Sequence, residues 1–492
     1  MLVLHVCAEV FPLLKTGGLA DVTAALPPAL IARGCDVRLL LPGFPAICDG
    51  VVQRRLVVTL PECFGASVVR LTLGRLPSGV QAYVIEAPEL YDRPGNPYAD
   101  ANNHAYGDNH RRFALLGWVA AQLAKGLDPT WKAQVVHAHD WHAGLAAAYM
   151  KADANSQGRK LAASVITVHN LAYQGVFGYD TFHELGLPDT FFGIDGIEFH
   201  GQVSFLKAGL FYADRITTVS PTYAQEIQQP EQGCGLDGLL RTRAADLVGI
   251  LNGVDAAIWS PARDAIIATQ YDADTLEGKA LCRTALQTET GLALQDAAPV
   301  FGVVSRLTDQ KGLQLVIAKM ETILALGGQL VLLGTGDAAL EAAFVALAAA
   351  HPTAVSVEIG FDEAKAHRIV AGCDVILVPS HFEPCGLTQL YGLAYGTLPL
   401  VRHVGGLADS VVDCTAQNLA AATATGFVFD AFTPAAFADA VRRAFALFER
   451  RNDWGRVQQQ AMQQCFGWDA AACKMLRLYE QITSPVGTTD LA

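Results

Sequence analysis

The chain has 492 residues, with 35 Lys and Arg against 48 Asp and Glu, and a formal net charge of -13. This length exceeds what one hydrophobic core usually supports, so we expect two or three domains. The acidic balance excludes a general attraction to nucleic acid or to an anionic membrane, and we expect neither as a partner. Any bound phosphate must be held by a few placed cations.

The cysteines and the N-terminus bear on the compartment. Eleven cysteines are scattered from Cys7 to Cys473 without a C-x-x-C pair. An odd number at irregular spacing is typical of free thiols rather than of a disulfide framework or a zinc site. The N-terminal residues lack the basic region and the cleavage site of a signal peptide. We therefore expect a cytoplasmic protein.

The first 41 residues predict a βαβ unit. Residues 2–8 and 36–41 are apolar strand candidates, and between them apolar residues recur at the helical spacings of three and four: Leu19, Val22, Leu26 and Leu30. A glycine-rich turn, Lys15-Thr16-Gly17-Gly18, precedes this helix. It matches neither G-x-G-x-x-G nor the Walker lysine motif, so neither a dinucleotide site nor a P-loop is predicted.

The remainder of the first half alternates strands with helices. Short strand-like runs at residues 67–73 and 81–85 are followed by a polar stretch, residues 92–109, that predicts a long functional loop. Further apolar strands are expected at residues 134–138, 163–168, 215–219 and 247–251. Such alternation indicates a parallel sheet covered by helices on both faces.

A histidine-rich segment ends one of these strands. Alternation along a strand places His137 and His139 on one face, and Asp140 or His142 could complete a metal site. No other ligand motif accompanies them, so the alternative is that these side chains line a polar cleft. His169 ends the next strand and is expected to face the same cleft.

The second half repeats the pattern. Residues 252–255, Asn-Gly-Val-Asp, end the first half, and strands are expected at residues 300–304, 329–333, 355–359, 374–378 and 397–401. We expect an α/β fold with domains at residues 1–255 and 256–460, and a segment 461–492 whose helix, 468–482, returns to the first domain. Asp272 and Asp274 form a D-x-D that predicts either a metal ligand pair or, more simply, helix capping.

Charged residues follow several strands of the second half. Arg306 and Lys311 flank a turn after one strand, and two cations placed there can stabilise a departing diphosphate. Glu383 follows another strand, three residues before a helix predicted to open at Gly386-Leu387-Thr388. The amides of such a helix N-terminus suit a phosphate, and the carboxylate suits sugar hydroxyls. The simpler alternative is a solvated basic pair and an ordinary loop glutamate.

Six motifs occur in order along nearly the whole chain. They begin at Lys15, His137, Thr167, Asn252, Ser305 and Glu383, and read KTGGLAD, HAHDWH, TVHN, NGVD, SRLTDQKG and EPCGLTQ. Together they resemble the bacterial glycogen synthases and the related plant starch synthases. The resemblance implies a GT-B glycosyltransferase with two Rossmann-like doubly wound domains facing a central cleft. It also implies transfer of glucose from ADP-glucose to the non-reducing end of an α-1,4-glucan, with retention and without metal or other cofactor.

The resemblance also implies roles for individual residues. Glu383, Lys311, Arg306, His169 and Asp140 are the implied catalytic residues, with Glu383 on the glucose hydroxyls and the cations on the phosphates. The implied donor-binding residues are Lys15, Gly17, Gly18, Asp21, Tyr98, Asn252, Phe361, Gly386, Leu387 and Thr388.

Two positions depart from the wider GT-B pattern. Tyr391 stands where many retaining enzymes carry a second glutamate for the ribose, and Phe361 stands where relatives often have a tyrosine against adenine. The alternatives left open are a GT-B relative that uses UDP-glucose or another acceptor, and an inactive glucan-binding homologue.

Overall fold

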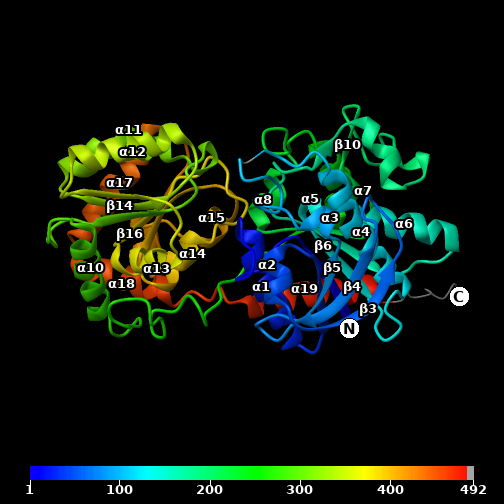
Figure 1. Ribbon diagram of the computed structural model, residues 1–492. Helices are drawn as coiled ribbons and strands as arrows, with labels where there is room; N and C mark the ends of the chain where they lie inside the picture. Colours follow the sequence, from blue (N-terminus) through cyan, green and yellow to red (C-terminus); the bar gives the residue numbers. More distant parts are fainter. Residues whose placement is uncertain (103, 485–492) are drawn as a thin grey trace, which may run out of the picture. The chain divides into compact units, whose positions relative to one another are not determined.

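The computed structural model describes residues 1–102 and 104–484 (Figure 1). The chain divides into two compact units. The first unit comprises residues 1–253 together with the C-terminal segment from Trp468, and the second unit comprises residues 254–467. Each unit is described by itself below.

The first unit is built on a nine-stranded sheet, counted over the described residues, in the order β12-β11-β7-β6-β1-β2-β5-β4-β3. Its strands are β1 (Leu2–Val6), β2 (Asp36–Pro42), β3 (Val52–Leu60), β4 (Val69–Arg75), β5 (Gln81–Glu86), β6 (Val135–His139), β7 (Ala163–Val168), β11 (Arg215–Thr218) and β12 (Leu247–Gly249). A small separate sheet contains β8 (Val176–Phe177), β9 (Glu198–Phe199) and β10 (Gln202–Ser204).

The parallel pairing expected for the strands at residues 134–138, 163–168, 215–219 and 247–251 is confirmed, but the opposite edge of the same sheet is antiparallel. Strand β3 pairs antiparallel with β4, and β4 pairs antiparallel with β5. No helix lies between these three strands. Because a parallel pair needs a crossover of a dozen or more residues, strands joined by short turns pair antiparallel instead.

The helix predicted after β1 is confirmed as α1 (Gly18–Ile31), and its four predicted apolar residues are buried. Helix α19 (Trp468–Thr483) packs on α1, and both cover one face of the sheet at Val3, Val37, Val135 and Val165. The other helices of the first unit are α2 (Pro45–Gly50), α3 (Pro88–Tyr91), α4 (Asn109–Lys125), α5 (Asp140–Ala143), α6 (Leu145–Gln157), α7 (Phe205–Tyr212), α8 (Pro221–Glu226) and α9 (Asp237–Thr242).

The second unit has a six-stranded parallel sheet, again counted over described residues, in the order β15-β14-β13-β16-β17-β18. Its strands are β13 (Val300–Val304), β14 (Gln329–Gly334), β15 (Val355–Ile359), β16 (Val375–Val378), β17 (Leu398–Arg402) and β18 (Phe427–Phe429). Its helices are α10 (Glu277–Thr290), α11 (Leu313–Ala325), α12 (Ala338–Ala350), α13 (Glu363–Gly372), α14 (Thr388–Ala394), α15 (Gly405–Ser410), α16 (Ala416–Ala420), α17 (Pro434–Phe448) and α18 (Arg451–Met462).

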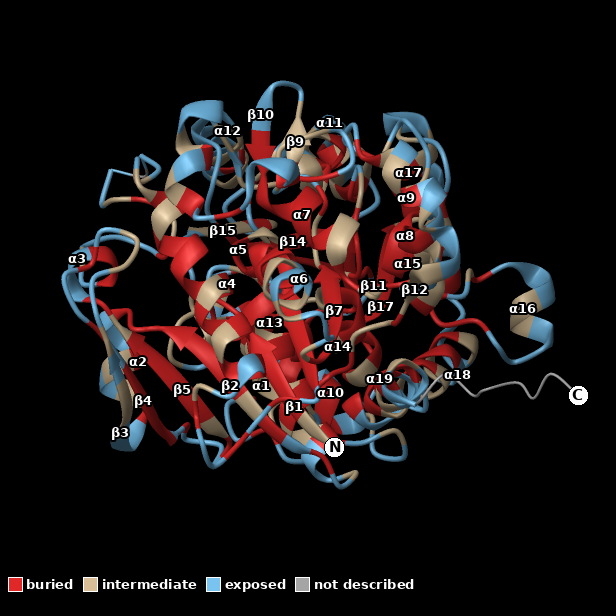
Figure 2. Ribbon diagram, turned by 90° about the vertical axis from the view of Figure 1, so that its right-hand side faces the viewer, coloured by how far each residue is buried: buried red, intermediate tan, exposed pale blue. Residues whose placement is uncertain are grey.

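All five strands predicted in the second half are confirmed to within a residue or two. Most of them are apolar runs because helices cover both faces of the sheet, whereas the edge strand β15 contains Ser356 and Glu358 and is only partly buried. Most strands of both large sheets are buried, whereas the edge strand β3 and the outward sides of the helices are exposed (Figure 2). Among the described residues, no helix combines the length and the apolar character needed to cross a bilayer.

Candidate functional site

Glu383 lies in the loop between β16 and α14, at the carboxyl edge of the second sheet. Glu383 is only 5% exposed, and its Oε2 accepts hydrogen bonds from Lys311 Nζ at 2.6 Å and from Ser380 Oγ at 2.9 Å. Lys311 comes from the turn that follows β13. A buried carboxylate is stable only when paired and hydrogen-bonded, so these two partners fix its orientation.

Glycines allow other loops to approach the Glu383 loop. Gly405 has φ +43°, and a Cβ there would overlap the carbonyl oxygen of Glu383. Gly406 donates its N–H to that same carbonyl at 3.1 Å. Gly312 has φ +67°, and a Cβ there would overlap the carbonyl oxygen of Pro379. The backbone near Glu383 is therefore held between the start of α15 and the turn that carries Lys311.

Replacing Gly405 by alanine is expected to displace the Glu383 loop. We expect Gly405→Ala to lower stability by about 2 kcal/mol or more and to lower activity, since the new methyl group meets backbone and the φ value disfavours an L residue. Gly291→Ala is the matched control, because Gly291 has φ +71° with nothing within 4 Å of an added Cβ. Equal losses in the two variants, measured by thermal unfolding and initial rates, would contradict the close approach.

Other predicted residues of the second unit surround this loop. Thr388 begins α14, as predicted, and its hydroxyl donates to Val304 O at 3.3 Å, which ties the helix start to the end of β13. Leu387 is the N-cap residue, and Gly386 has φ +72°. The Arg306 side chain is exposed and makes no hydrogen bond or ion pair with any described residue. Its guanidinium is therefore accessible to an anion.

The two positions that depart from the GT-B pattern differ in exposure. Phe361 follows β15 and is 73% exposed, so its ring has a face open to a stacking partner. Tyr391 is instead occupied, because its ring stacks on Trp259 with the centroids 3.8 Å apart and 5° between the planes. Trp259 stacks on His367 with its other face. Tyr391 therefore has a packing role at the position where many retaining GT-B enzymes carry a second glutamate.

In the first unit, the loop between β1 and α1 presents a lysine and a buried glutamate. Lys15 Nζ pairs with Asp21 Oδ1 at 3.0 Å, and both side chains are about a quarter exposed or less, at 25% and 22%. Glu9 accepts hydrogen bonds from Thr16 N at 2.6 Å and Thr16 Oγ1 at 2.5 Å, and also from the Tyr98 hydroxyl. Glu9 therefore joins the Lys15 loop to the loop predicted at residues 92–109.

Gly17 is open on the side where a side chain would stand. A Cβ built at Gly17 meets nothing within 4 Å. Packing within the described chain therefore does not require glycine at this position. Because Gly17 has no side chain, a ligand near Lys15 can approach the backbone closely. Phosphate-binding loops use glycine in the same way.

Asp140 and His169 form a second pair in the first unit. Asp140 directly follows β6 and has φ +54°, and its Oδ1 accepts the backbone N–H of His169 at 2.7 Å. Burial raises the pKa of Asp140 to about 7, and the nearby charge of Glu9 adds to the effect. Burial lowers the pKa of His169 to about 3. The pair therefore consists of a carboxyl group that titrates near neutrality and a neutral imidazole.

Asp140→Asn is expected to change how stability depends on pH. In the unfolded chain Asp140 ionises with the ordinary aspartate pKa of 3.8, whereas in the folded chain its pKa is about 7. Because the folded pKa is raised, the stabilising effect of the protonated group is present below pH 4 and is lost as the pH rises to about 7. Relative to wild type, the asparagine variant should gain up to about 4 kcal/mol of unfolding free energy across this range. A difference that stays constant with pH in urea unfolding would contradict the raised pKa.

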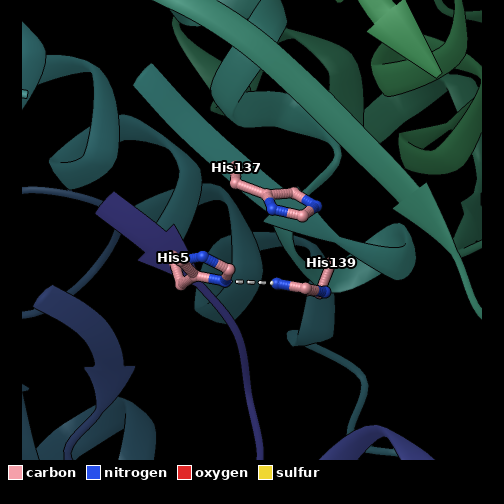
Figure 3. A group of neighbouring side chains, drawn as sticks. All are labelled: His5, His137 and His139. Atoms are coloured by element: carbon pink, nitrogen blue, oxygen red, sulfur yellow. Dashed lines mark hydrogen bonds between the residues drawn. The ribbon is translucent and has the colours of Figure 1, made fainter. Parts of the chain in front are cut away.

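Three histidines gather behind this pair (Figure 3). Ring nitrogens of His5, His137 and His139 lie within 4.8 Å of one another. The ring of His137 stacks on that of His139 with the centroids 4.3 Å apart, and the nitrogens of all three rings are engaged in hydrogen bonds. A metal ion would have to displace these bonds. The third member of the group is His5 rather than the expected Asp140 or His142.

The D-x-D sequence takes the simpler of its two predicted roles only in part. Asp272 Oδ1 accepts hydrogen bonds from Asp274 N at 3.0 Å and from Thr275 Oγ1 at 2.8 Å. These bonds close a turn just before α10. The predicted helix capping is wrong in detail, because the N-cap residue of α10 is Leu276 and no side chain caps it.

Each unit thus collects its own predicted residues. Lys15, Asp21, Tyr98, Asp140 and His169 belong to the first unit with Gly17 and Gly18. Asn252 also belongs to the first unit and lines a cavity of about 20 Å³ with Thr217 and Trp468. The prediction missed Glu9 and Ser380. The sequence could have indicated Glu9, because a glutamate is unusual within the apolar run that follows β1. Ser380, a serine three residues before Glu383, has no comparable pattern around it.

Comparisons with known proteins agree on one family. A family model described as the starch synthase catalytic domain matches residues 2–242, and one described as glycosyl transferases group 1 matches residues 289–460. The glycogen synthase of Francisella philomiragia subsp. philomiragia is 58% identical, covering 98% of this chain and 100% of that protein. The glycogen synthase of Francisella tularensis subsp. novicida is 57% identical, covering 98% and 99%.

Solved structures give the same result for the fold. The catalytic domain of Starch Synthase IV from Arabidopsis thaliana, bound to ADP and acarbose, has a TM-score of 0.89 at 31% identity and covers 98% of this chain and 99% of that one. Sucrose-phosphate synthase from Thermosynechococcus elongatus has a TM-score of 0.57 at 16% identity, with 98% of both chains covered. The second likeness concerns the fold alone.

Proposed function

Because the chain belongs to the glycogen synthase family, and is therefore a GT-B glucosyltransferase that elongates a glucan, we propose that its donor is ADP-glucose. The related starch synthase domain was solved with ADP, which supports the adenine nucleotide. That structure also holds acarbose, which supports an α-1,4-glucan as acceptor. We place the reaction in the cytoplasm, a proposal supported by the irregular spacing of the eleven cysteines, which is unlike a disulfide framework.

The observation that carries the proposal is the Glu383–Lys311 pair at the carboxyl edge of a doubly wound sheet, where such sheets bind ligands. Arg306 is exposed at the end of the neighbouring strand, and the amides of Leu387 and Thr388 donate to no other described residue. In the proposed complex, Arg306, Lys311 and the amides of Leu387 and Thr388 hold the diphosphate. Glu383 holds the hydroxyls of the donor glucose.

The first unit supplies the other half of the proposed site. Lys15 would move from Asp21 to the diphosphate, with Gly17 and Gly18 leaving room for the sugar nucleotide. His169 would lie beside the glucose, with Asp21, Tyr98, Asp140 and Asn252 shaping the pocket. The exposed ring of Phe361 would stack on adenine. Closure of the two units on the donor would gate turnover, as in other enzymes that exclude water before reaction.

The proposed reaction proceeds at one face of the sugar. The bond between glucose C1 and the phosphate oxygen breaks, and ADP keeps the electron pair. The acceptor 4-hydroxyl forms the new bond to C1 from the same face, and its proton passes to the departing phosphate oxygen. Arg306 and Lys311 stabilise the charge that grows on ADP. Trapping a glucosyl group on Glu383 or another side chain would contradict this route.

A donor comparison tests the proposal. Initial rates are measured with ADP-glucose and with UDP-glucose, in each case with glycogen as acceptor. We expect ADP-glucose to give the larger kcat/KM. Equal or higher values with UDP-glucose would overturn the donor assignment, and no release of nucleotide from either donor would point to an inactive glucan-binding homologue.

A further inference from the structure

A line of polar side chains crosses the first sheet beneath α19. His5, His137 and Thr167 lie on the same face of the sheet, because side chains alternate between the two faces along each strand and residues paired across strands share a face. The strand registers pair His5 with His137, His139 with Thr167, and Thr167 with Thr217. Helix α19 covers this face, so the line is buried between the sheet and the helix.

The first part of the line runs through two threonines to a tyrosine of α19. Thr217 Oγ1 and Thr167 Oγ1 are 2.5 Å apart, and Thr167 Oγ1 is 2.6 Å from His137 Nε2. The other nitrogen of His137, Nδ1, lies 2.6 Å from the Tyr479 hydroxyl. That hydroxyl also contacts His5 Nε2 at 3.4 Å. Tyr479 therefore joins the threonine end of the line to His5.

The second part of the line ends at the candidate site. His5 Nδ1 is 2.9 Å from His139 Nε2, the contact drawn in Figure 3. His139 Nδ1 is in turn 2.9 Å from His169 Nε2. The remaining nitrogen of His169, Nδ1, makes no hydrogen bond to any of the described residues, and His169 is half-buried. His169 Nδ1 is thus the outer end of the line.

The four imidazoles are neutral, because burial lowers the pKa of His5 and of His169 to about 3 and lowers the pKa of His137 and of His139 well below the usual range. A neutral imidazole has one N–H and one accepting nitrogen. Only two arrangements place one proton in every contact of the line. In one arrangement all four histidines carry the proton on Nδ1, and in the other all four carry it on Nε2.

The threonine end distinguishes these arrangements. With all protons on Nδ1, Thr217 donates to Thr167, Thr167 donates to His137 Nε2, and every proton inside the line has an acceptor. With all protons on Nε2, His137 donates to Thr167, and one of the two threonine hydroxyl protons has no acceptor among the described residues. A buried donor without a partner is costly, so the Nδ1–H arrangement is favoured.

We infer that Tyr479 is a positioning residue that sets the tautomer of His169. The Tyr479 hydroxyl accepts from His137 and donates to His5, and this direction passes through His139 to His169. His169 then presents an N–H, a hydrogen-bond donor, at its outer nitrogen. The inference rests on the proposed function in one respect, that His169 lies beside the donor glucose, where this N–H would donate to a sugar hydroxyl oxygen.

Neutron diffraction of the deuterium-exchanged full chain tests the direction of the line. We expect deuterium on Nδ1 of all four histidines and the Tyr479 deuteron directed at His5 Nε2. Deuterium on Nε2 of any of the four would overturn the inference. This measurement needs no turnover, so it stands or falls separately from the choice of sugar donor and acceptor.

Tyr479→Phe tests the role of the tyrosine. Without the hydroxyl, we expect a mixture of the two neutral tautomers of His169, seen as partial deuterium occupancy at each ring nitrogen. We also expect kcat to be lower by about 2- to 10-fold, with KM changed by less than about twofold, the size of one net hydrogen bond. Tyr149→Phe is the matched control, because its buried hydroxyl donates to Leu185 O at 2.6 Å in the same unit. A His169 that stays protonated on Nδ1 alone, or equal kcat losses in both variants, would overturn the assignment.

Discussion

Glu383→Gln is expected to lower kcat by about 10²- to 10³-fold, the cost of removing one preorganised charged group at a reacting centre. Glutamine keeps the shape of the side chain but not its charge, so it loses the ion pair with Lys311 at 2.6 Å while keeping an acceptor for Ser380. Initial rates with ADP-glucose and glycogen measure the effect. Calorimetric titration with ADP should give a Kd within about threefold of wild type, since the carboxylate is proposed to hold the sugar rather than the nucleotide.

The ion pair Glu358–Lys365, whose glutamate is far more exposed than Glu383, provides the control for Glu383. The Glu358 side chain is 45% exposed and pairs with Lys365 on the same unit. An exposed ion pair contributes little, so Glu358→Gln should retain wild-type rates. A Glu383→Gln variant that kept kcat within tenfold of wild type would show that this carboxylate is not part of the reacting centre.

Lys311→Met is expected to weaken donor binding by about 2–5 kcal/mol, the range found when one member of a buried charge pair is removed. The variant loses a cation for the diphosphate and also leaves Glu383 buried without its ion-pair partner. The Kd of ADP and the KM of ADP-glucose should therefore both rise, and kcat should fall as well. Titration with ADP and initial rates measure the two effects separately.

Lys365→Met is the matched control for this variant, because Lys365 also pairs with a glutamate of the second unit, and its side chain is 13% exposed against 19% for Lys311. Its Kd for ADP should equal that of wild type. If Lys311→Met lowered kcat but left the Kd for ADP unchanged, Lys311 would serve only to hold Glu383, and the phosphate contact proposed for it would be wrong.

Five of the six strands that the structure describes in the second unit were predicted from local patterns, whereas the three-residue β18 was not predicted. The β13 and β16 strands are continuous apolar runs, and the helix at Thr388 begins where a glycine with positive φ ends the loop. The edge of the first sheet was not predictable in the same way. Strand β3 is mostly exposed and lacks a clear alternation, so it gave no strand signal, and the antiparallel pairing depends on tertiary contacts.

The candidate site was predictable as a set of loops at strand ends, but its internal contacts were not. Arg306 and Lys311 were expected to act together, yet the structure pairs Lys311 with Glu383 and leaves Arg306 exposed. Contacts between residues 72 positions apart depend on how the loops pack. The contacts of His5 could not be predicted for a similar reason. A single histidine in an apolar strand gives no sign of which residues of the neighbouring strands it contacts.

The most direct test of the central proposal is a crystal structure of the chain with ADP and a glucan oligosaccharide. We predict that one ADP contacts both units, with Lys15 Nζ and the Arg306 guanidinium each within hydrogen-bonding distance, about 2.7–3.2 Å, of its phosphate oxygens. ADP bound by the second unit alone, with Lys15 still paired to Asp21 and directed away from the nucleotide, would contradict the proposal.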